Sequence, residues 1–491
     1  MKKLLISLYN LLDDKYMRLL LFLIMPFIII FATSFRIDND FWFIINTGRE
    51  ILNNGFITIE PFTIHEGLNF IPQQWLCGII FYFIYNKFSV YGMLIFVIFI
   101  GYITIFLLYR ICLLVSSNNY KLSFLITCYI GILIGSSFMV TRPYLFDIVF
   151  LLLEIYLLEL YVIKGKNKYL YVLPIISILM INLHASIWPM LFVVFIPYFI
   201  GCIKNKYFKD ENYKLKPLIL VFIIMFMCSF INPYGLDMLF YLFNSYGYAE
   251  LNEIVGEMNP ITVFVIPASL FILVTLLSFY YVCYKRRKIK IRYLLLFLGS
   301  LLLAFLHMRG CLFLFIFGFL SLIDNFNIRR EKNNVVEENS ILILFFYVFI
   351  FIICILLFIF NVNVIDEKES EYYKIVELLD NNASKDIKLY TGYNTGPYFE
   401  YRGYKCYLDT RAELFYKAIN KKENIMIEYY NILNNKVDVQ SFLKKYDFDY
   451  LVVGINEPFY YSLQYLGYNL YYDSGKYRLY KNGSKKYDEN S

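Results

Sequence analysis

Charged residues are scarce in this sequence. Asp, Glu, Lys and Arg make up 17% of the 491 residues, whereas hydrophobic residues make up 59% and aromatic residues 20%. A soluble globular protein of ordinary composition has more charge and less apolar surface. The composition therefore excludes an ordinary soluble domain and predicts a protein that lies in a bilayer.

The sequence also lacks regularly spaced cysteines and internal repeats. It contains no Cys-x-x-Cys pair, and eight of its nine cysteines, all except Cys406, lie in or beside apolar segments. Because disulfide frameworks and zinc sites need paired or regularly spaced thiols, we expect the cysteines to be structural. The absence of transmembrane repeats, heptads and low-complexity tracts argues against a solenoid or a long disordered linker.

Apolar segments that can span a membrane are abundant. A transmembrane helix needs about 20 apolar residues. Charged residues interrupt the N-terminus before the first long apolar run, so we interpret that run as an uncleaved transmembrane helix and not as a secretory signal. Residues 74–86 are short and are followed by Lys87, which indicates a juxtamembrane or re-entrant helix. About eleven candidate spans lie near residues 19–34, 89–110, 121–140, 144–163, 169–186, 187–203, 217–231, 261–284, 293–307, 310–323 and 341–362.

The basic residues predict how these spans cross the membrane. Lys and Arg concentrate in the cytoplasmic loops of membrane proteins. If the N-terminus is cytoplasmic, every strong basic cluster falls on the cytoplasmic side, and an odd number of spans places the C-terminal end outside. Topology then explains the formal net charge of +7, and we expect no nucleic-acid partner. The clusters are Lys164–Lys168, Lys204–Lys216, Lys285–Arg292 and Arg329–Lys332.

The composition changes after Asn361. From there the sequence is polar and rich in tyrosine, and short apolar runs alternate with helix-like stretches, a pattern typical of a small α/β domain. We therefore predict an α-helical polytopic membrane domain over residues 1–362, with a large first extracytoplasmic loop at 35–73. An extracytoplasmic α/β domain is predicted over 363–491. Its apolar runs lie at 387–390, 404–408 and 450–453.

Two carboxylates follow the first predicted span directly. Asp38 and Asp40 are spaced i, i+2 at the start of an expected helix, where they can cap free backbone N–H groups. A carboxylate beside a lipid phosphate can also take a proton from an acceptor hydroxyl or hold a divalent cation. We therefore treat Asp40 as the candidate catalytic base or metal ligand and Asp38 as its partner.

Other ionisable residues lie at the same, outer ends of the predicted spans. Ionisable groups at a membrane boundary are costly and are functional candidates by default, although an arginine there can be a snorkelling anchor and a histidine a structural residue. Cationic groups can stabilise the charge that develops on a leaving phosphate. We assign donor-phosphate binding to Arg142, His184 and Arg309. Further candidates for the pocket are Glu253, Glu257, His307, His65 and Trp42.

Several motifs resemble those of bacterial membrane proteins of the GT-C glycosyltransferase superfamily. The stretch from Asp38 to Trp42 and the segments after it resemble the first-loop signature in order and spacing. This chain has Phe43-Ile44 where the signature has a histidine, and it matches an expected Glu-Trp only loosely at Glu257-Met258. Further matching segments are Thr47-Gly48, Glu60-Pro61-Phe62, Gln74-Trp75-Leu76, Arg142-Pro143-Tyr144, Asn182-Leu183-His184, Asn232-Pro233-Tyr234-Gly235, Gly396-Pro397-Tyr398 and Asp409-Thr410-Arg411-Ala412-Glu413.

The resemblance implies a GT-C architecture, a polyprenyl-phosphate-linked sugar donor and an acidic first-loop residue that acts as base or metal ligand. It implies transfer of the sugar to a glycan, lipid or protein acceptor on the extracytoplasmic face of the cell membrane. The cofactor is left open, with Mg²⁺ or Mn²⁺ as the candidate divalent cation at Asp38 and Asp40.

Two alternatives remain. A lipid or oligosaccharide transporter or flippase would carry ionisable residues near span centres, as Asp147, Glu154 and Glu159 do in the fourth predicted span. An assembly protein would bind a partner through its tail, whose tyrosines are suited to stacking on sugar rings. We expect no catalysis in the tail, where Asp409 and Arg411 are candidates for an ion pair that supports the fold.

Overall fold

The chain forms two compact units in the computed structural model. We call the first the helical unit; it comprises Met1–Phe35, Leu94–Ile231 and Gly256–Val364. We call the second the sheet unit; it comprises Arg36–Met93, Asn232–Val255 and Ile365–Ser491. The predicted span 341–362, all of 19–34 except Phe22, and the candidate Glu253 lie outside the described residues. The structure describes residues 22, 37–203, 206–209, 211–245, 256–262, 265–327 and 372–484.

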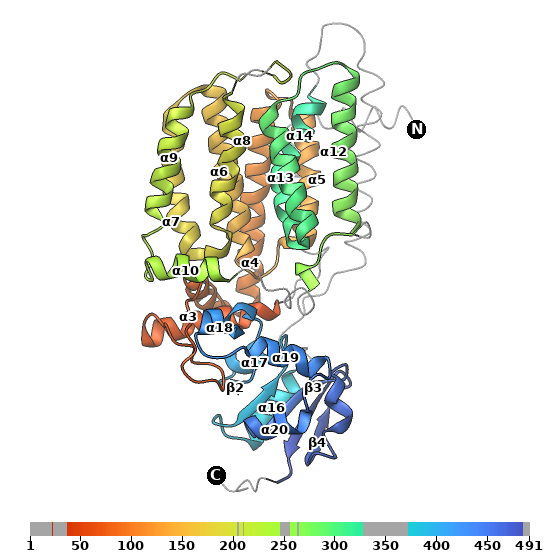
Figure 1. Cartoon of the computed structure of the whole chain (residues 1–491). Coiled ribbons are helices and arrows are strands. Elements are labelled where there is room, and N and C mark those ends of the chain that lie inside the picture. The colour runs from red at the N-terminus through yellow and green to blue at the C-terminus, as the bar shows by residue number, and fades with distance from the viewer. Residues whose placement is uncertain are drawn as a thin grey trace. The chain divides into compact units, whose positions relative to one another are not determined.

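Apolar helices that lie side by side make up the helical unit (Figure 1). Within the described residues, each predicted span between residues 89 and 323 falls on a helix. Four of the described helices are long and apolar enough to cross a membrane, while the number of about eleven spans stays a prediction. The helices are α4 (Trp75–Val115, which enters this unit from residue 94), α5 (Tyr120–Phe138), α6 (Tyr144–Lys164), α7 (Leu173–Leu183), α8 (Pro189–Gly201), α9 (Leu215–Cys228), α12 (Ile266–Tyr284), α13 (Ile291–Leu306) and α14 (Cys311–Phe326).

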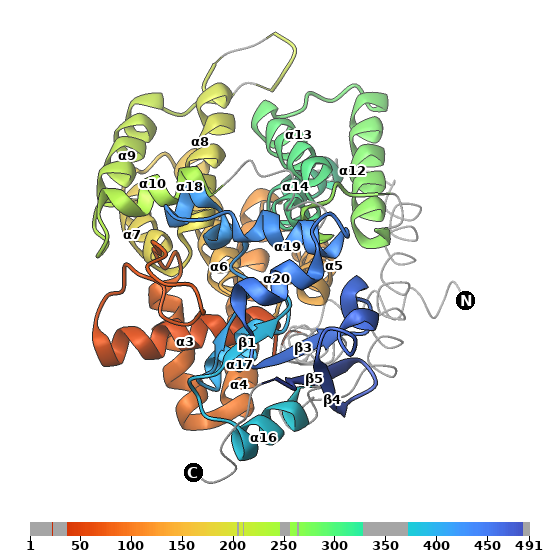
Figure 2. The same ribbon diagram turned by 60° about the horizontal axis from the view of Figure 1, so that its bottom comes forward.

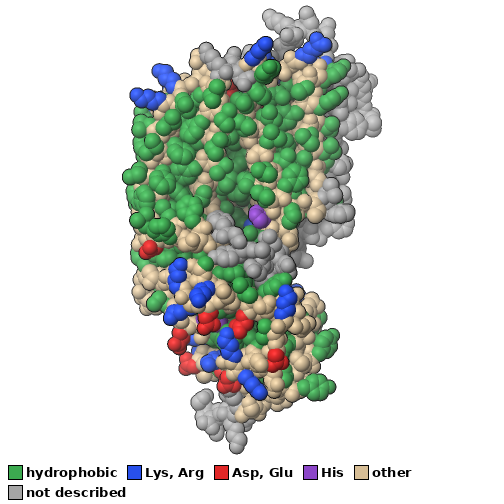
Figure 3. Space-filling view, viewed as in Figure 1, with side chains coloured by type: hydrophobic (Ala, Val, Ile, Leu, Met, Phe, Trp, Pro, Cys, Tyr) green, Lys and Arg blue, Asp and Glu red, His purple; other side chains and the backbone are tan. Residues whose placement is uncertain are grey.

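Hydrophobic side chains cover the face of the helical unit that Figure 3 shows, and basic side chains gather at one end of it. Ile223 on α9, Leu277 on α12 and Leu302 on α13 are 52%, 55% and 60% exposed. Soluble monomers rarely expose apolar patches of this extent, whereas lipid tails accommodate them. The helical unit is therefore that of a membrane protein.

The residues predicted as a separate short helix, 74–86, belong to the first part of α4. This helix continues across Ser89, where φ is +54° and the backbone leaves the helical conformation. The break lies close to the boundary between the two units at residues 93 and 94. Residues 75–88 therefore form a helix of the sheet unit that continues into a helix of the helical unit.

Helix α6 carries carboxylates into the interior of the helical unit. Glu159 accepts hydrogen bonds from Arg292 at 2.8 Å (Nη2) and 3.1 Å (Nε), and from the hydroxyls of Tyr198 and Tyr293 at 2.8 and 2.7 Å. A buried carboxylate with this many donors is accounted for structurally. Both oxygens of Glu154, in contrast, are buried and have no hydrogen-bond partner among the described residues.

The sheet unit contains the predicted C-terminal α/β fold, with a five-stranded sheet in the order β2-β1-β3-β5-β4. Strand β1 (Lys388–Thr391) pairs in parallel with β2 (Lys405–Cys406) and β3 (Tyr450–Gly454), which confirms strands in all three predicted apolar runs. Strands β4 (Tyr468–Asp473) and β5 (Tyr477–Asn482) add an antiparallel hairpin (Figure 2). The accompanying helices are α16 (Tyr373–Asn382), α17 (Gly396–Tyr401), α18 (Lys417–Asn420), α19 (Ile425–Leu433) and α20 (Val439–Tyr446).

The first loop completes one edge of this sheet. Thr63 forms a parallel bridge with Cys406 of β2. The N–H of Ile64 donates to the Cys406 carbonyl at 2.9 Å, and the N–H of Cys406 donates to the Phe62 carbonyl at 3.3 Å. Since an edge strand otherwise presents unpaired backbone groups, this short segment covers the free side of β2. Residues of the first loop and the tail are thus parts of one compact unit.

Helix α3 (Asn39–Asn54) also belongs to the sheet unit and packs against α17 and the first part of α4. A Cβ atom on Gly48 would overlap the backbone carbonyl of Gly78, so the two helix backbones touch where both residues are glycine. Trp42 lies against the rings of Tyr398 and Tyr401, with centroids 5.0 Å away in each case. Helix α3 is therefore fixed on two sides.

Candidate functional site

Asp38 and Asp40 lie at the N-terminus of α3. Asp38 is the N-cap residue, and its Oδ1 accepts a hydrogen bond from the backbone N–H of Asp40 at 2.9 Å. Asp40 lies in the first turn, where a carboxylate is favoured by the helix dipole. The capping role expected for at least one of the pair is thus found at Asp38. Asp40 follows Asp38 in the first turn, so the two carboxylates lie at the same end of α3.

The candidate Trp42 has a structural setting. It is 7% exposed, and its ring contacts Tyr85 as well as the two α17 tyrosines described above. About two helical turns further along, Arg49 donates to the carbonyl of Tyr401 at 3.1 Å, and its guanidinium lies 5.0 Å from the Tyr401 ring centroid. These contacts hold α3 on α17, which positions the two aspartates at its start.

The candidate His65 connects the first loop to the tail. Its Nε2 hydrogen-bonds the carbonyl of Tyr407 at 2.9 Å, and its ring lies edge-on to Tyr446 at 5.7 Å. Burial lowers the pKa of His65, and it outweighs the opposing effects of the Tyr407 carbonyl and nearby glutamates. A neutral, buried imidazole with a backbone partner acts in the fold of the sheet unit.

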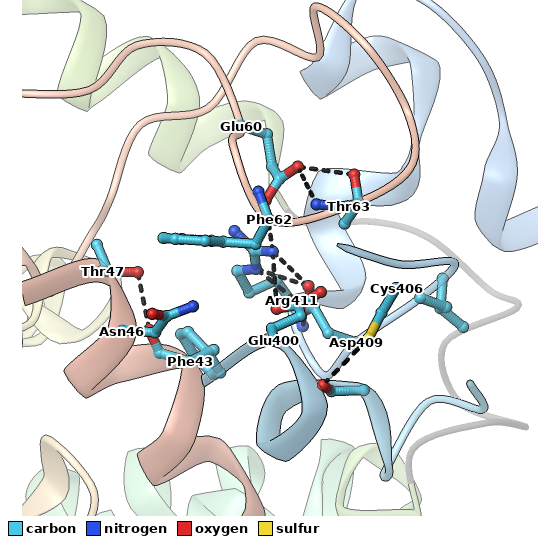
Figure 4. Close-up of polar contacts among 12 residues, drawn as sticks. Phe43, Asn46, Thr47, Glu60, Phe62, Thr63, Glu400, Cys406, Asp409 and Arg411 are labelled. Carbon is cyan, nitrogen blue, oxygen red and sulfur yellow. Dashed lines mark hydrogen bonds and ion pairs between the residues drawn. The ribbon is translucent and has the colours of Figure 1, made fainter. Parts of the chain in front are cut away.

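The sheet unit also contains a cluster of one arginine and three carboxylates, Arg411 with Glu60, Glu400 and Asp409 (Figure 4). The guanidinium of Arg411 contacts Asp409 through Nε at 3.1 and 2.9 Å, and its Nη2 donates to Glu60 at 2.9 Å and to Glu400 at 3.5 Å. All four side chains are buried. Burial raises the pKa of Glu400 well above its ordinary value, and repulsion from Asp409 adds to this effect. The raised pKa favours the protonated form of Glu400, which would reduce the negative charge that Arg411 must balance.

Two predicted phosphate ligands meet in the helical unit. Arg309 Nε lies 2.8 Å from Glu257 Oε2, and Arg142 Nη1 lies 3.4 Å from the same oxygen. Burial raises the pKa of Glu257, but the charges of Arg142 and Arg309 outweigh it, so the pKa is lowered overall. The structure therefore brings Arg142, Arg309 and Glu257 together as one ionic cluster.

The remaining candidates of this unit are two histidines, each at the end of a helix. His307 follows α13, and its Nδ1 hydrogen-bonds the carbonyl of Met258 at 2.7 Å, next to Glu257. His184 follows α7, and its Nδ1 lies 2.6 Å from Asp147 Oδ2 in the first turn of α6. The structure thus pairs each histidine with a specific acceptor. Asp147 is buried, and its Oδ1 has no partner among the described residues.

Sequence reasoning had assigned Asp147 to the transporter alternative and not to the site. It is the partner of His184, five residues after Arg142. A signal for this position exists in the sequence, because an acidic residue in the first turn after a proline is typical of a helix start. The contact of Glu60 with Arg411 had no comparable signal, since it joins segments 351 positions apart in the sequence.

The candidate residues divide between the two units. Asp38, Asp40, Trp42 and His65 belong to the sheet unit, whereas Arg142, His184, Glu257, His307 and Arg309 belong to the helical unit. The grouping of the two sets into one catalytic pocket stays a prediction.

A resident divalent cation does not fit the described residues by themselves. These contain no group of three or more His, Cys, Asp or Glu side chains that could hold a metal ion. Asp38 and Asp40 supply two carboxylates, and one Asp38 oxygen already accepts the Asp40 N–H. Since water can fill the further positions around Mg²⁺ or Mn²⁺, a divalent cation at Asp38 and Asp40 stays a prediction, and the reaction proposed below contains no metal step.

Comparison with solved structures identifies the fold. The chain is similar to the oligosaccharyltransferase of Archaeoglobus fulgidus tethered to an acceptor peptide, with 11% identity and a TM-score of 0.58 over 96% of this chain and 74% of that one. The same enzyme, AglB, in complex with an inhibitory peptide and a dolichol-phosphate gives 11% identity and a TM-score of 0.61 over 95% of this chain and 74% of that one. Its complex with Zn and sulfate gives 11% identity and a TM-score of 0.57 over 94% of this chain and 73% of that one.

Sequence comparisons add nothing to this result, since no family model and no curated protein match the sequence. The likeness therefore concerns the fold. It extends over nearly the whole chain, including both the helical unit and the sheet unit. The chain has the fold of the Archaeoglobus fulgidus oligosaccharyltransferase, in agreement with the resemblance inferred from the motifs.

Proposed function

We propose that this protein is a membrane glycosyltransferase that transfers a sugar from a polyprenyl-phosphate-linked donor to an acceptor on the extracytoplasmic face. The observation that carries the proposal is the convergence of Arg142 and Arg309 on one carboxylate oxygen in the helical unit. Two guanidinium groups aimed at one anionic oxygen are suited to a phosphate group. The fold shared with oligosaccharyltransferases, whose solved complexes contain a peptide and a dolichol-phosphate, supports the same activity.

In the proposed reaction, the acceptor's nucleophilic oxygen or nitrogen forms a bond to the anomeric carbon of the donor sugar. The bond between that carbon and the phosphate oxygen breaks, and the phosphate leaves with the electron pair. Arg142 and Arg309 stabilise the charge that develops on it, with His184 as a further donor. Asp40 takes the proton from the acceptor, and Asp38 keeps the start of α3 in place.

The test is a transfer assay with the purified protein in lipid nanodiscs. Labelled polyprenyl-phosphate sugars are supplied with candidate glycan, lipid and peptide acceptors, and the release of sugar from the donor is measured. We expect Asp40→Asn to lower the rate by roughly 10²- to 10⁴-fold, as loss of a general base does. Glu50→Gln is the matched control, since Glu50 lies on the same helix and its side chain accepts a hydrogen bond from Asn54, one turn away.

Folding of both variants is checked by thermal unfolding, and the assay is repeated with a chelator. A folded Asp40→Asn protein with the activity of the wild type removes the proposed role of Asp40. If the chelator abolishes the wild-type rate and Mg²⁺ or Mn²⁺ restores it, the reaction requires a divalent cation that the described residues do not hold by themselves. If the wild type consumes no donor, the proposal that the protein is an enzyme is wrong.

A transporter or flippase is the second candidate, and Glu154 favours it. This carboxyl is fully buried in α6, and neither oxygen has a hydrogen-bond partner in the described part of the chain. Lone buried carboxyls within membrane helices are typical of proton or substrate pathways. If lipid or sugar crosses the membrane of proteoliposomes without chemical change, and Glu154→Gln abolishes this movement, the transporter proposal replaces the transferase proposal.

A further inference from the structure

Glu257 occupies the position in which the proposed function requires a phosphate. Its Oε2 alone accepts from both arginines, at 2.8 Å from Arg309 Nε and 3.4 Å from Arg142 Nη1. We propose that Glu257 is an internal anion that holds Arg142 and Arg309 in position until the donor arrives, and that the donor phosphate displaces it. This inference rests on the proposed function, because it takes these arginines as the phosphate ligands.

The ion pairs at Glu257 are exposed enough to be exchanged. The side chains of Glu257 and Arg309 are 44% and 39% exposed, and that of Arg142 is 17% exposed. Exposed ion pairs contribute little net stability, since water solvates the separated charges well. A phosphate offers several oxygens to the two guanidinium groups, whereas Glu257 uses one. The exchange therefore replaces a weak internal contact with a stronger one.

The backbone around Glu257 allows this exchange without movement of the whole segment. The next residue, Met258, is held through its carbonyl by His307 Nδ1 at 2.7 Å. The carbonyl of Asn259 accepts from the N–H of Met308 at 2.8 Å. On the other side, a Cβ placed on Gly256 would meet open space. In this proposal the Glu257 side chain rotates away from the arginines, while the residues anchored by His307 and Met308 stay in place.

The charge of Glu257 determines what can replace it. The arginines outweigh the effect of burial and lower the pKa of this carboxyl, so it is ionised at neutral pH. Removing Glu257 takes away the carboxylate charge that lies against both guanidinium groups. An uncharged lipid or a neutral glycan cannot balance them. The expected ligand is therefore a phosphate group. The uncharged lipid tail does not compete with Glu257 for the two arginines.

The test compares the binding of undecaprenyl phosphate and of the uncharged alcohol undecaprenol to the protein in nanodiscs. Glu257→Gln keeps the size of the side chain and removes its charge. We expect it to lower the Kd for undecaprenyl phosphate by up to about fivefold, the range of a single exposed ion pair, and to leave the Kd for undecaprenol unchanged. Arg309→Gln should raise the Kd for the phosphate, and Glu50→Gln should change neither.

Inorganic phosphate provides a second probe. Stronger competition by inorganic phosphate in Glu257→Gln than in the wild type supports a site that recognises the phosphate itself. An unchanged or higher Kd for undecaprenyl phosphate in a folded Glu257→Gln protein overturns the inference. The same gain for undecaprenol also overturns it, because that gain would come from the lipid tail.

The two proposals fail separately. If the wild type transfers sugar while Glu257→Gln binds phosphate no more tightly than the wild type, the proposed transferase is supported and the proposed displacement of Glu257 is wrong. If Glu257→Gln binds phosphate more tightly while the wild type never consumes a donor, the phosphate site stands without the transferase. Glu257→Ala is a second variant. Equal gains in phosphate affinity for the Ala and Gln variants support displacement, whereas a loss for both shows that Glu257 is needed to build the site.

Discussion

Glu60 Oε1 and Arg411 Nη2 lie 2.9 Å apart, although 351 positions separate them in the sequence. The contact joins the first loop to the tail within the sheet unit. Both side chains are buried, so water cannot take the place of either partner. Because buried charges are costly without partners, this pair makes the first loop and the tail depend on each other for stability.

Removing Arg411 should destabilise the sheet unit strongly. Arg411→Ala leaves the carboxyls of Glu60, Glu400 and Asp409 buried together without their cation, and breaking a buried pair costs about 3–5 kcal/mol. We expect a clearly lower Tm in detergent or nanodiscs. The control is Lys445→Ala, which breaks a surface pair with Glu428 at 2.8 Å and should cost no more than about 1 kcal/mol. Equal effects of the two variants would contradict the prediction.

Asp38 allows capping and chemistry to be separated. Asparagine caps helices as well as aspartate does, whereas alanine loses the cap at a cost of about 1 kcal/mol. We therefore expect Asp38→Asn to keep the Tm of the wild type and Asp38→Ala to lower it. If the charge of Asp38 supports catalysis, Asp38→Asn lowers the transfer rate at least about tenfold. A fully active Asp38→Asn protein would restrict Asp38 to its role as N-cap.

The contact of α3 with α4 should depend on glycine. Gly48→Ala places a methyl group against the backbone of Gly78, which cannot give way as a flexible side chain does. We expect a lower Tm and lower transfer activity, because α3 carries both candidate aspartates. Gly299→Ala, in α13, is the control: nothing lies within 4 Å of its added Cβ, and alanine favours helix. The two substitutions should change Tm in opposite directions.

Glu457 should make the stability of the sheet unit depend on pH. Burial raises its pKa from 4.5 to about 7, although the N–H of Gly454 and the hydroxyl of Tyr390 favour the ionised form. Since the folded state holds this proton more tightly, the resulting stabilisation is complete below about pH 4.5 and is lost as the pH rises through about 7. We expect the Tm of the wild type to fall over this window relative to Glu457→Gln. Parallel Tm curves for the two proteins would contradict the prediction.

Local sequence patterns were sufficient for the helices of the helical unit and for the first three strands. Long apolar runs bounded by charged or polar residues mark the helices α5 to α9 and α12 to α14, and the apolar runs 387–390 and 450–453 became β1 and β3. Strands β4 and β5 were not predicted. Their burial pattern is mixed, with β4 mostly exposed, so hydrophobicity gives no clear alternation there.

Long-range pairing explains what the sequence could not predict. The first loop was expected to be an extracytoplasmic connection of the membrane domain, but nothing local in Phe62-Thr63-Ile64 indicates that it pairs with Cys406. At the candidate site, the residue types were found, while their partners were not. Glu257 was named beside Arg142 and Arg309 without the contact between them, and Asp147 was separated from His184.

The pairing of residues 62–64 with β2 has a consequence for how the protein is made. A ribosome that adds roughly 5–20 residues per second needs on the order of 20–70 s to proceed from Glu60 to Arg411, 351 positions later. During that time the early segment has neither its strand partner nor its cation. The carboxylates that we assign to chemistry therefore reach their final setting only near the end of synthesis, and a chain released early is an inactive one.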